Sequence, residues 1–182
     1  MLATIDRQTA IQQLNIEHAA VRELINTLTP EEMTYPDTIR YGLYWDQKLS
    51  FKDLLAHLIT YEVYSVEAVK AWSQGQSHPV TNAMLSESGG RAIHYGGIED
   101  RRHLSLEEVL AEWERSQSEL MTTIHRLTDA DWHARAPYPT DVSTDLGGIL
   151  EIILVAPPRP PYRHLPVHIP DTQVYIASLR RK

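Results

Sequence analysis

Two histidines lie four residues apart near the C-terminal end of the sequence, in the segment RHLPVHIP (163–170). Side chains at positions i and i+4 of an α-helix lie on one face, so His164 and His168 can direct both imidazoles at a single ion. The best candidate for a third ligand is His57, in the middle of an earlier helical segment. Three imidazoles that leave a position open to water are a usual ligand set of catalytic zinc sites. The three histidines therefore predict a divalent metal centre, which the rest of the chain must assemble.

The prolines of this segment restrict where the last helix begins. Pro166, between the two histidines, would break a helix interior, but it is tolerated in a first turn, so the helix is expected to begin at about His164. Pro170 is then expected to kink the helix one turn later. The positive end of the helix disfavours imidazolium, which keeps both rings neutral and able to bind a metal.

The residues around the three histidines limit the reaction. The segment 164–168 lacks the glutamate of the His-Glu-x-x-His motif, so peptide hydrolysis by the zinc-protease mechanism is not indicated. Tyr61, one turn after His57, and Glu62 are the nearest candidates for catalytic proton transfer. The alternative is that Tyr61 lies at the edge of the core and that Glu62 is solvated.

Composition excludes several classes of site and favours others. The chain has 182 residues, a length that predicts a single domain over residues 1–182. It contains no cysteine, so nitrogen and oxygen atoms must hold any metal. Zinc and nickel are favoured for an all-histidine site, with iron and manganese as alternatives.

Charge and hydropathy bear on partners and location. Lys and Arg number 17 and Asp and Glu 24, so the formal charge is 17 − 24 = −7, and the basic residues are scattered. This predicts that nucleic acid is not a partner. No apolar run approaches the roughly 20 residues that cross a bilayer, so no membrane association is expected. The N-terminus lacks the features of a signal peptide, which predicts a cytoplasmic protein.

Apolar residues recur at helical spacing along most of the chain and predict an all-α fold with about four main helices. The first helix is expected from Asp6 to Leu28. The second begins at a capping-box-like segment, 50–53, and runs to about Trp72; the third begins at a full capping box, 105–108. A short apolar helix over 145–156 precedes the last helical segment.

Glycine and proline are frequent in residues 75–104, which predicts a long connection of the kind that forms lids or binding loops. His78, His94 and His103 are expected to be solvated loop residues, with the alternative that one reaches over the site in a lid. His18 lies on the apolar stripe of the first helix. It is predicted to be a hydrogen-bonded core or core-edge histidine, with second-shell or ligand roles as alternatives.

Three blocks, in this order, resemble the DinB/YfiT-like superfamily of metalloenzymes. The first is LYW (43–45) followed by LSFKDLLAHLITYE (49–62), the second is LSLEEVLAE (104–112), and the third is YRHLPVHIPD (162–171). The resemblance implies an antiparallel four-helix bundle, often a homodimer, with one divalent metal held by a histidine of the second helix and the closing histidine pair. The residues that match are His57, His164 and His168.

Two functions follow from this resemblance and from the residues themselves. The first function is that of a metal-dependent enzyme that acts on a small molecule, by metal-activated hydrolysis or by transfer of a low-molecular-weight thiol. Thiol transfer is included because characterised members of the superfamily include thiol-dependent transferases and isomerases. The other is a non-enzymatic bundle whose metal or polar pocket serves stability or ligand binding. A structural metal site is closed by a fourth protein ligand. The sequence offers no obvious fourth ligand, which favours the enzyme.

Overall fold

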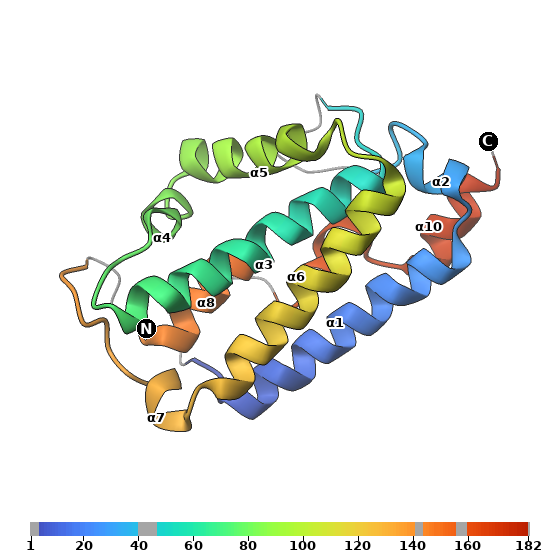
Figure 1. Ribbon diagram of the computed structural model, residues 1–182. Helices are drawn as coiled ribbons and strands as arrows, with labels where there is room; N and C mark the ends of the chain where they lie inside the picture. The colour runs from blue at the N-terminus through green and yellow to red at the C-terminus, as the bar shows by residue number, and fades with distance from the viewer. Residues whose placement is uncertain (1–3, 40–46, 141–143, 156–159, 182) are drawn as a thin grey trace.

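The computed structural model describes residues 4–39, 47–140, 144–155 and 160–181, and within these ranges the chain is built from helices (Figure 1). In chain order they are α1 (Arg7–Thr27), α2 (Pro30–Thr34), α3 (Phe51–Ser73), α4 (Pro79–Ala83), α5 (Glu87–Arg101), α6 (Leu106–Arg126), α7 (Asp129–Trp132), α8 (Leu146–Val155), α9 (Leu165–His168) and α10 (Thr172–Leu179). In the same ranges, β pairing is limited to two isolated bridges. The predicted all-α fold is confirmed. Residues 43–45 of the first sequence block lie outside the described residues.

Capping boxes begin two of the long helices where the sequence predicts them. Ser50 accepts a hydrogen bond from the backbone of Asp53, and the Asp53 carboxylate accepts one from the backbone of Ser50, at the start of α3. Ser105 and Glu108 do the same at the start of α6. Each box satisfies backbone N–H groups that have no partner within the helix, so the start of the helix depends on residues only three apart.

The long helices α1, α3 and α6 lie side by side, but they do not simply alternate in direction (Figure 1). Lys52, at the start of α3, donates to the carbonyl of Leu104 just before α6, and Lys70, near the end of α3, pairs with Glu119 in the second half of α6. Helices α3 and α6 therefore run in the same direction. The expected antiparallel arrangement of four helices is not confirmed.

This parallel pair explains the long connection between α3 and α6. Helix α3 has 23 residues and is thus roughly 35 Å long, so the chain must return over that length before α6 begins. It does so through α4 and α5, and the prediction that residues 75–104 are a loop is wrong. Gly97 lets α5 lie close to α3, because a Cβ there would be 2.0 Å from Thr60 Oγ1. Docking on α3 thus compensates for a glycine-rich sequence that is a poor helix former alone.

Two clusters of buried apolar side chains fill the interior, and both draw on α1, α3 and α6. On α3, Leu55 and Leu58 belong to one cluster and Tyr61 to the other, so His57 lies where the two meet. No described helix combines the length and apolar character that crossing a bilayer requires.

The C-terminal segment is broken into two short helices. Pro166 lies in the first turn of α9, as predicted. At Pro170 the expected kink is instead a full interruption, because α9 ends at His168 and α10 begins at Thr172, capped by Asp171. Proline cannot donate a backbone hydrogen bond, and a helix of one turn gains too little to continue through it.

Candidate metal centre

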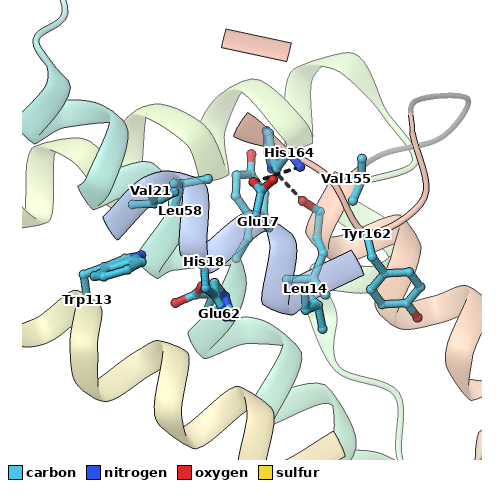
Figure 2. A pocket seen from close by; sticks show the side chains of 12 residues that line it. Leu14, Glu17, His18, Val21, Leu58, Glu62, Trp113, Val155, Tyr162 and His164 are labelled. Atoms are coloured by element: carbon cyan, nitrogen blue, oxygen red, sulfur yellow. Dashed lines mark hydrogen bonds and ion pairs between the residues drawn. The ribbon is translucent and has the colours of Figure 1, made fainter. Parts of the chain in front are cut away.

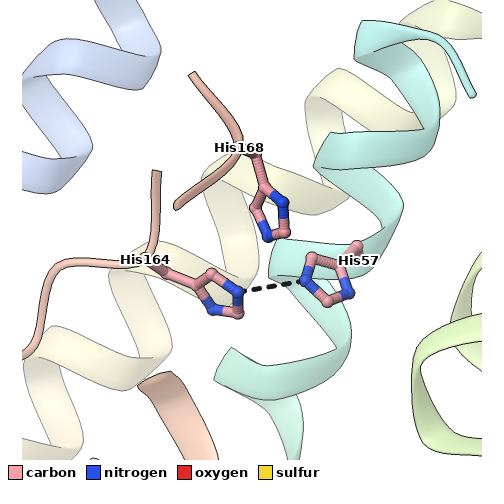
Figure 3. A group of neighbouring side chains, drawn as sticks. All are labelled: His57, His164 and His168. Carbon is pink, nitrogen blue, oxygen red and sulfur yellow. Dashed lines mark hydrogen bonds between the residues drawn. The ribbon is translucent and has the colours of Figure 1, made fainter. Parts of the chain in front are cut away.

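The structure brings the three predicted histidines together from two distant parts of the chain (Figure 3). His57 projects from α3, and His164 and His168 lie at the two ends of α9. One ring nitrogen of each lies within 4.8 Å of the others, and His57 Nε2 is 3.1 Å from His164 Nε2. Two nitrogens bound tetrahedrally to one zinc ion lie roughly 3.3 Å apart. The spacing of this pair therefore fits a shared divalent ion.

In the rings of His164 and His57, a hydrogen bond made by Nδ1 determines that Nε2 is the nitrogen that faces the space between the three histidines. His164 Nδ1 lies 2.6 Å from the carbonyl oxygen of Leu154, which can only accept, so Nδ1 carries the proton and the lone pair is on Nε2. His57 Nδ1 lies 2.6 Å from His94 Nδ1. When His57 Nδ1 donates to His94, the lone pair of His57 is on Nε2, which faces His164 Nε2. Contacts of this kind orient the histidine ligands of metal sites.

His94 is the residue at this site that the sequence interpretation misplaced. The expectation of a solvated loop residue is wrong, because His94 lies on α5 with 1% of its surface exposed. His94 contacts the ring of His57, so one of the three histidines of this region does reach the site, as the alternative expected, but from a helix. Burial, with the nearby His164 and the Arg91 guanidinium, lowers the pKa of His94 to about 3, so its imidazole is neutral near pH 7. The spacing of His94 and Ile98, both buried, is a helical signal that the flanking glycines obscured.

The other two histidines of this region stay away from the three candidate ligands. His78 caps α4 by accepting from the backbone of Val80 and pairs with Glu67 at 3.3 Å. His103 is exposed, as predicted.

Tyr61 lies against two of the three histidines, in keeping with its position one turn after His57. Its ring meets that of His57 edge-on with centroids 4.6 Å apart, and lies 5.3 Å from that of His164. Tyr61 is 4% exposed, so these contacts occur in a largely dry environment. His168 is the most exposed of the three histidines, at the half-buried level, although both of its ring nitrogens are covered.

Glu62 is buried, so the alternative that it is a solvated glutamate is wrong. Its Oε1 lies 2.9 Å from His18 Nε2 on α1, and its Oε2 accepts from Ser116 Oγ on α6 at 2.5 Å. The interpretation of His18 as a hydrogen-bonded core histidine is confirmed. Figure 2 shows His18 and Glu62 on one wall of a cavity that His164 and Tyr162 also line. Its volume of about 20 Å³ admits a water molecule but no substrate.

Two solved structures share this fold. One is an uncharacterised protein from Escherichia coli UTI89, with a TM-score of 0.66 and 15% identity over 97% of this chain and 90% of that chain. The other is the colibactin self-resistance protein ClbS in complex with a dsDNA, with a TM-score of 0.68 and 12% identity over 100% of this chain and 95% of that chain.

ClbS contradicts the prediction that nucleic acid is excluded as a partner, because a protein of this fold has been crystallised with dsDNA. The prediction relied on a net charge of −7 and on basic residues that are scattered along the sequence, and neither describes the charge of any one surface of the folded chain.

No curated protein matches this chain in sequence. The family comparison is more informative, and its match ends before the segment that carries His164 and His168. A sequence model of the DinB superfamily matches residues 13–155, more than half of the chain, so the chain belongs to the DinB superfamily.

Proposed function

We propose that this chain is a metal-dependent enzyme that acts on a small molecule and holds one divalent ion through His57, His164 and His168. The observation that carries the proposal is the convergence of three imidazole nitrogens within 4.8 Å. Among the described residues this group has no fourth His, Cys, Asp or Glu member, which favours a catalytic over a structural site. Zinc or nickel suits the all-imidazole ligand set best, with iron and manganese as alternatives.

When bound, the ion supplies Lewis-acid activation of a water molecule or of a low-molecular-weight thiol. The chain contributes the orientation of its ligands, since the Leu154 carbonyl and His94 hold the rings of His164 and His57. Tyr61 is the first candidate for proton transfer, at its hydroxyl, because its ring touches two of the three ligands. Glu62 is the second, at Oε1, where it contacts His18 Nε2.

Metal content tests this proposal directly. Protein purified without chelator is expected to contain close to one divalent ion per chain by elemental analysis, and His57→Ala or His168→Ala to lose it. His125→Ala is the matched control, because His125 is exposed on α6 and far from α9 in sequence. No metal in the wild type and no uptake on titration with zinc or nickel would overturn the site.

Thermal unfolding gives a second measure. Zinc at about 100 times its Kd stabilises a protein by about 2.7 kcal/mol. For a chain of 182 residues this is a rise in Tm of about 5–11 °C. The rise is expected in the wild type and in His125→Ala, and to be absent from His57→Ala.

Activity separates the enzyme from a non-enzymatic binding bundle. The metal-loaded protein is expected to turn over at least one compound of a two-part panel. Esters and amides test hydrolysis, and electrophiles supplied together with a low-molecular-weight thiol test thiol transfer. Turnover is expected to disappear in His57→Ala. A metal-loaded protein that is inert to the whole panel favours the binding bundle.

Duplex DNA is a second candidate partner, on the ground that ClbS is crystallised with dsDNA. Because the chain carries a net charge of −7, binding would be confined to a local basic surface and would weaken steeply with salt. Fluorescence anisotropy of a labelled duplex at two salt concentrations tests this. Unchanged anisotropy at low salt excludes it.

A further inference from the structure

Helix α9 carries two of the three candidate ligands but is too short to hold them in place. It has four residues, whereas isolated helices shorter than roughly 12–15 residues are marginal in water. Its N-cap residue, His164, makes no side-chain capping hydrogen bond, so the first backbone N–H groups need acceptors from elsewhere. The position of His164 must therefore be set by another part of the chain.

Glu17 of α1 provides that acceptor. Its Oε1 accepts from the backbone N–H of His164 at 3.0 Å and from the backbone N–H of Leu165, and its Oε2 accepts from Arg163 Nε at 3.2 Å. One carboxylate thus binds three consecutive residues, 163–165. Figure 2 shows Glu17 and its contact with His164. Glu17 is 5% exposed, so water competes little for these donors.

Glu17 and Leu154 act on different parts of the same ligand. The Leu154 carbonyl holds the imidazole of His164 through Nδ1. Glu17 holds the backbone from which that imidazole projects. Together they leave the ring little freedom of translation or rotation, and hold its Nε2 at 3.1 Å from His57 Nε2.

We propose that Glu17 is a positioning residue of the metal centre, which holds the start of α9 against α1 so that His164 faces His57. This inference rests on the proposed function, since it assigns Glu17 to the same three-histidine site. Loss of partners that orient metal ligands typically costs about 10–100-fold in metal affinity.

Two substitutions of Glu17 test its role as a positioning residue, one by removing the acceptor completely and one by removing it in part. Glu17→Leu fills the space of the side chain without any acceptor, so the N–H groups of His164 and Leu165 lose their partner. Glu17→Gln keeps one carbonyl oxygen that can still accept from both. Ser116→Ala is the matched control, because it removes another buried hydrogen bond, to Glu62, away from α9.

The zinc Kd, measured by competition with a chromophoric chelator, is expected to rise about 10–100-fold in Glu17→Leu. It should rise only a few-fold in Glu17→Gln and stay unchanged in Ser116→Ala. The Co²⁺-loaded Glu17→Leu protein is also expected to show an altered visible spectrum, which reports ligand geometry and not overall stability. If Glu17→Leu does not fold, the same comparison is made between Glu17→Gln and Ser116→Ala.

A wild-type zinc Kd and cobalt spectrum in Glu17→Leu, with an equal fall in Tm with and without zinc, would show that Glu17 supports only the fold. That result overturns the inference and leaves the proposed function intact. Absence of zinc binding in the wild type overturns both, so the two failures are distinguished by the wild-type titration.

Discussion

Replacing Gly97 with alanine is expected to push α5 away from α3, whereas the same change at the neighbouring Gly96 is expected to stabilise the protein. A Cβ at Gly97 would lie 2.0 Å from Thr60 Oγ1 and 2.8 Å from both Thr60 Cβ and Cγ2. Rotation of the Thr60 side chain moves Oγ1 and Cγ2 but leaves Cβ in place, so the backbone must shift. A Cβ at Gly96 would meet nothing within 4 Å.

The size of the effect follows from two opposing contributions. Both substitutions replace glycine with alanine inside a helix, which favours folding by roughly 0.5–1 kcal/mol. Overpacking against Thr60 costs about 1–3 kcal/mol and applies only to Gly97→Ala. The helix-propensity gain cancels in the difference between the variants, so the free energy of unfolding should be lower by about 1–3 kcal/mol in Gly97→Ala than in Gly96→Ala.

Thermal and urea unfolding of the metal-free variants measure this difference. It corresponds to a Tm lower by roughly 2–12 °C in Gly97→Ala than in Gly96→Ala. The zinc Kd should also rise in Gly97→Ala alone, because α5 carries His94 to its contact with His57. Equal stability of the two variants would refute the close packing of α5 on α3, and would be the behaviour expected if residues 75–104 formed a loop.

Two further outcomes are expected. His94→Leu removes the partner of His57 Nδ1 and should weaken zinc binding by about 10–100-fold. His94→Asn keeps an acceptor on a short side chain and should retain most of the affinity for zinc. A wild-type zinc Kd in His94→Leu would contradict this prediction. Burial opposes ionisation of Asp145, but hydrogen bonds from Thr4, Gly148 and His133 outweigh it and lower the pKa of Asp145. A carboxyl group whose pKa is lower in the folded state stabilises the protein at pH values above its pKa in the unfolded chain, roughly 3.9. This stabilisation is lost as the pH falls through the pKa of the folded state. In urea unfolding, the wild type should therefore be more stable than Asp145→Asn at pH 6, and the difference in the free energy of unfolding should become smaller below pH 4. A difference that does not depend on pH would contradict the lowered pKa of Asp145.

The sequence by itself determined the long helices and their starts. The capping boxes at Ser50 and Ser105 and the apolar periodicity of α1, α3 and α6 involve residues three to four positions apart, so local physics is sufficient to predict them. The i,i+4 spacing and the resemblance to DinB/YfiT-like proteins likewise selected His164, His168 and His57. The structure places these three side chains together.

Only the tertiary structure decided what surrounds those histidines. Helix α5 is stable because it docks on α3, and the contact of His94 with His57 joins residues 37 positions apart. Glu17 reaches His164 across 147 positions, and Glu62 is buried because His18 of α1 and Ser116 of α6 both contact it. Contacts of this kind depend on which helix faces lie opposite one another, here on the parallel course of α3 and α6, and no local pattern in the chain encodes that. The sequence thus identifies the candidate ligands, and the packing of the helices supplies the residues that orient them.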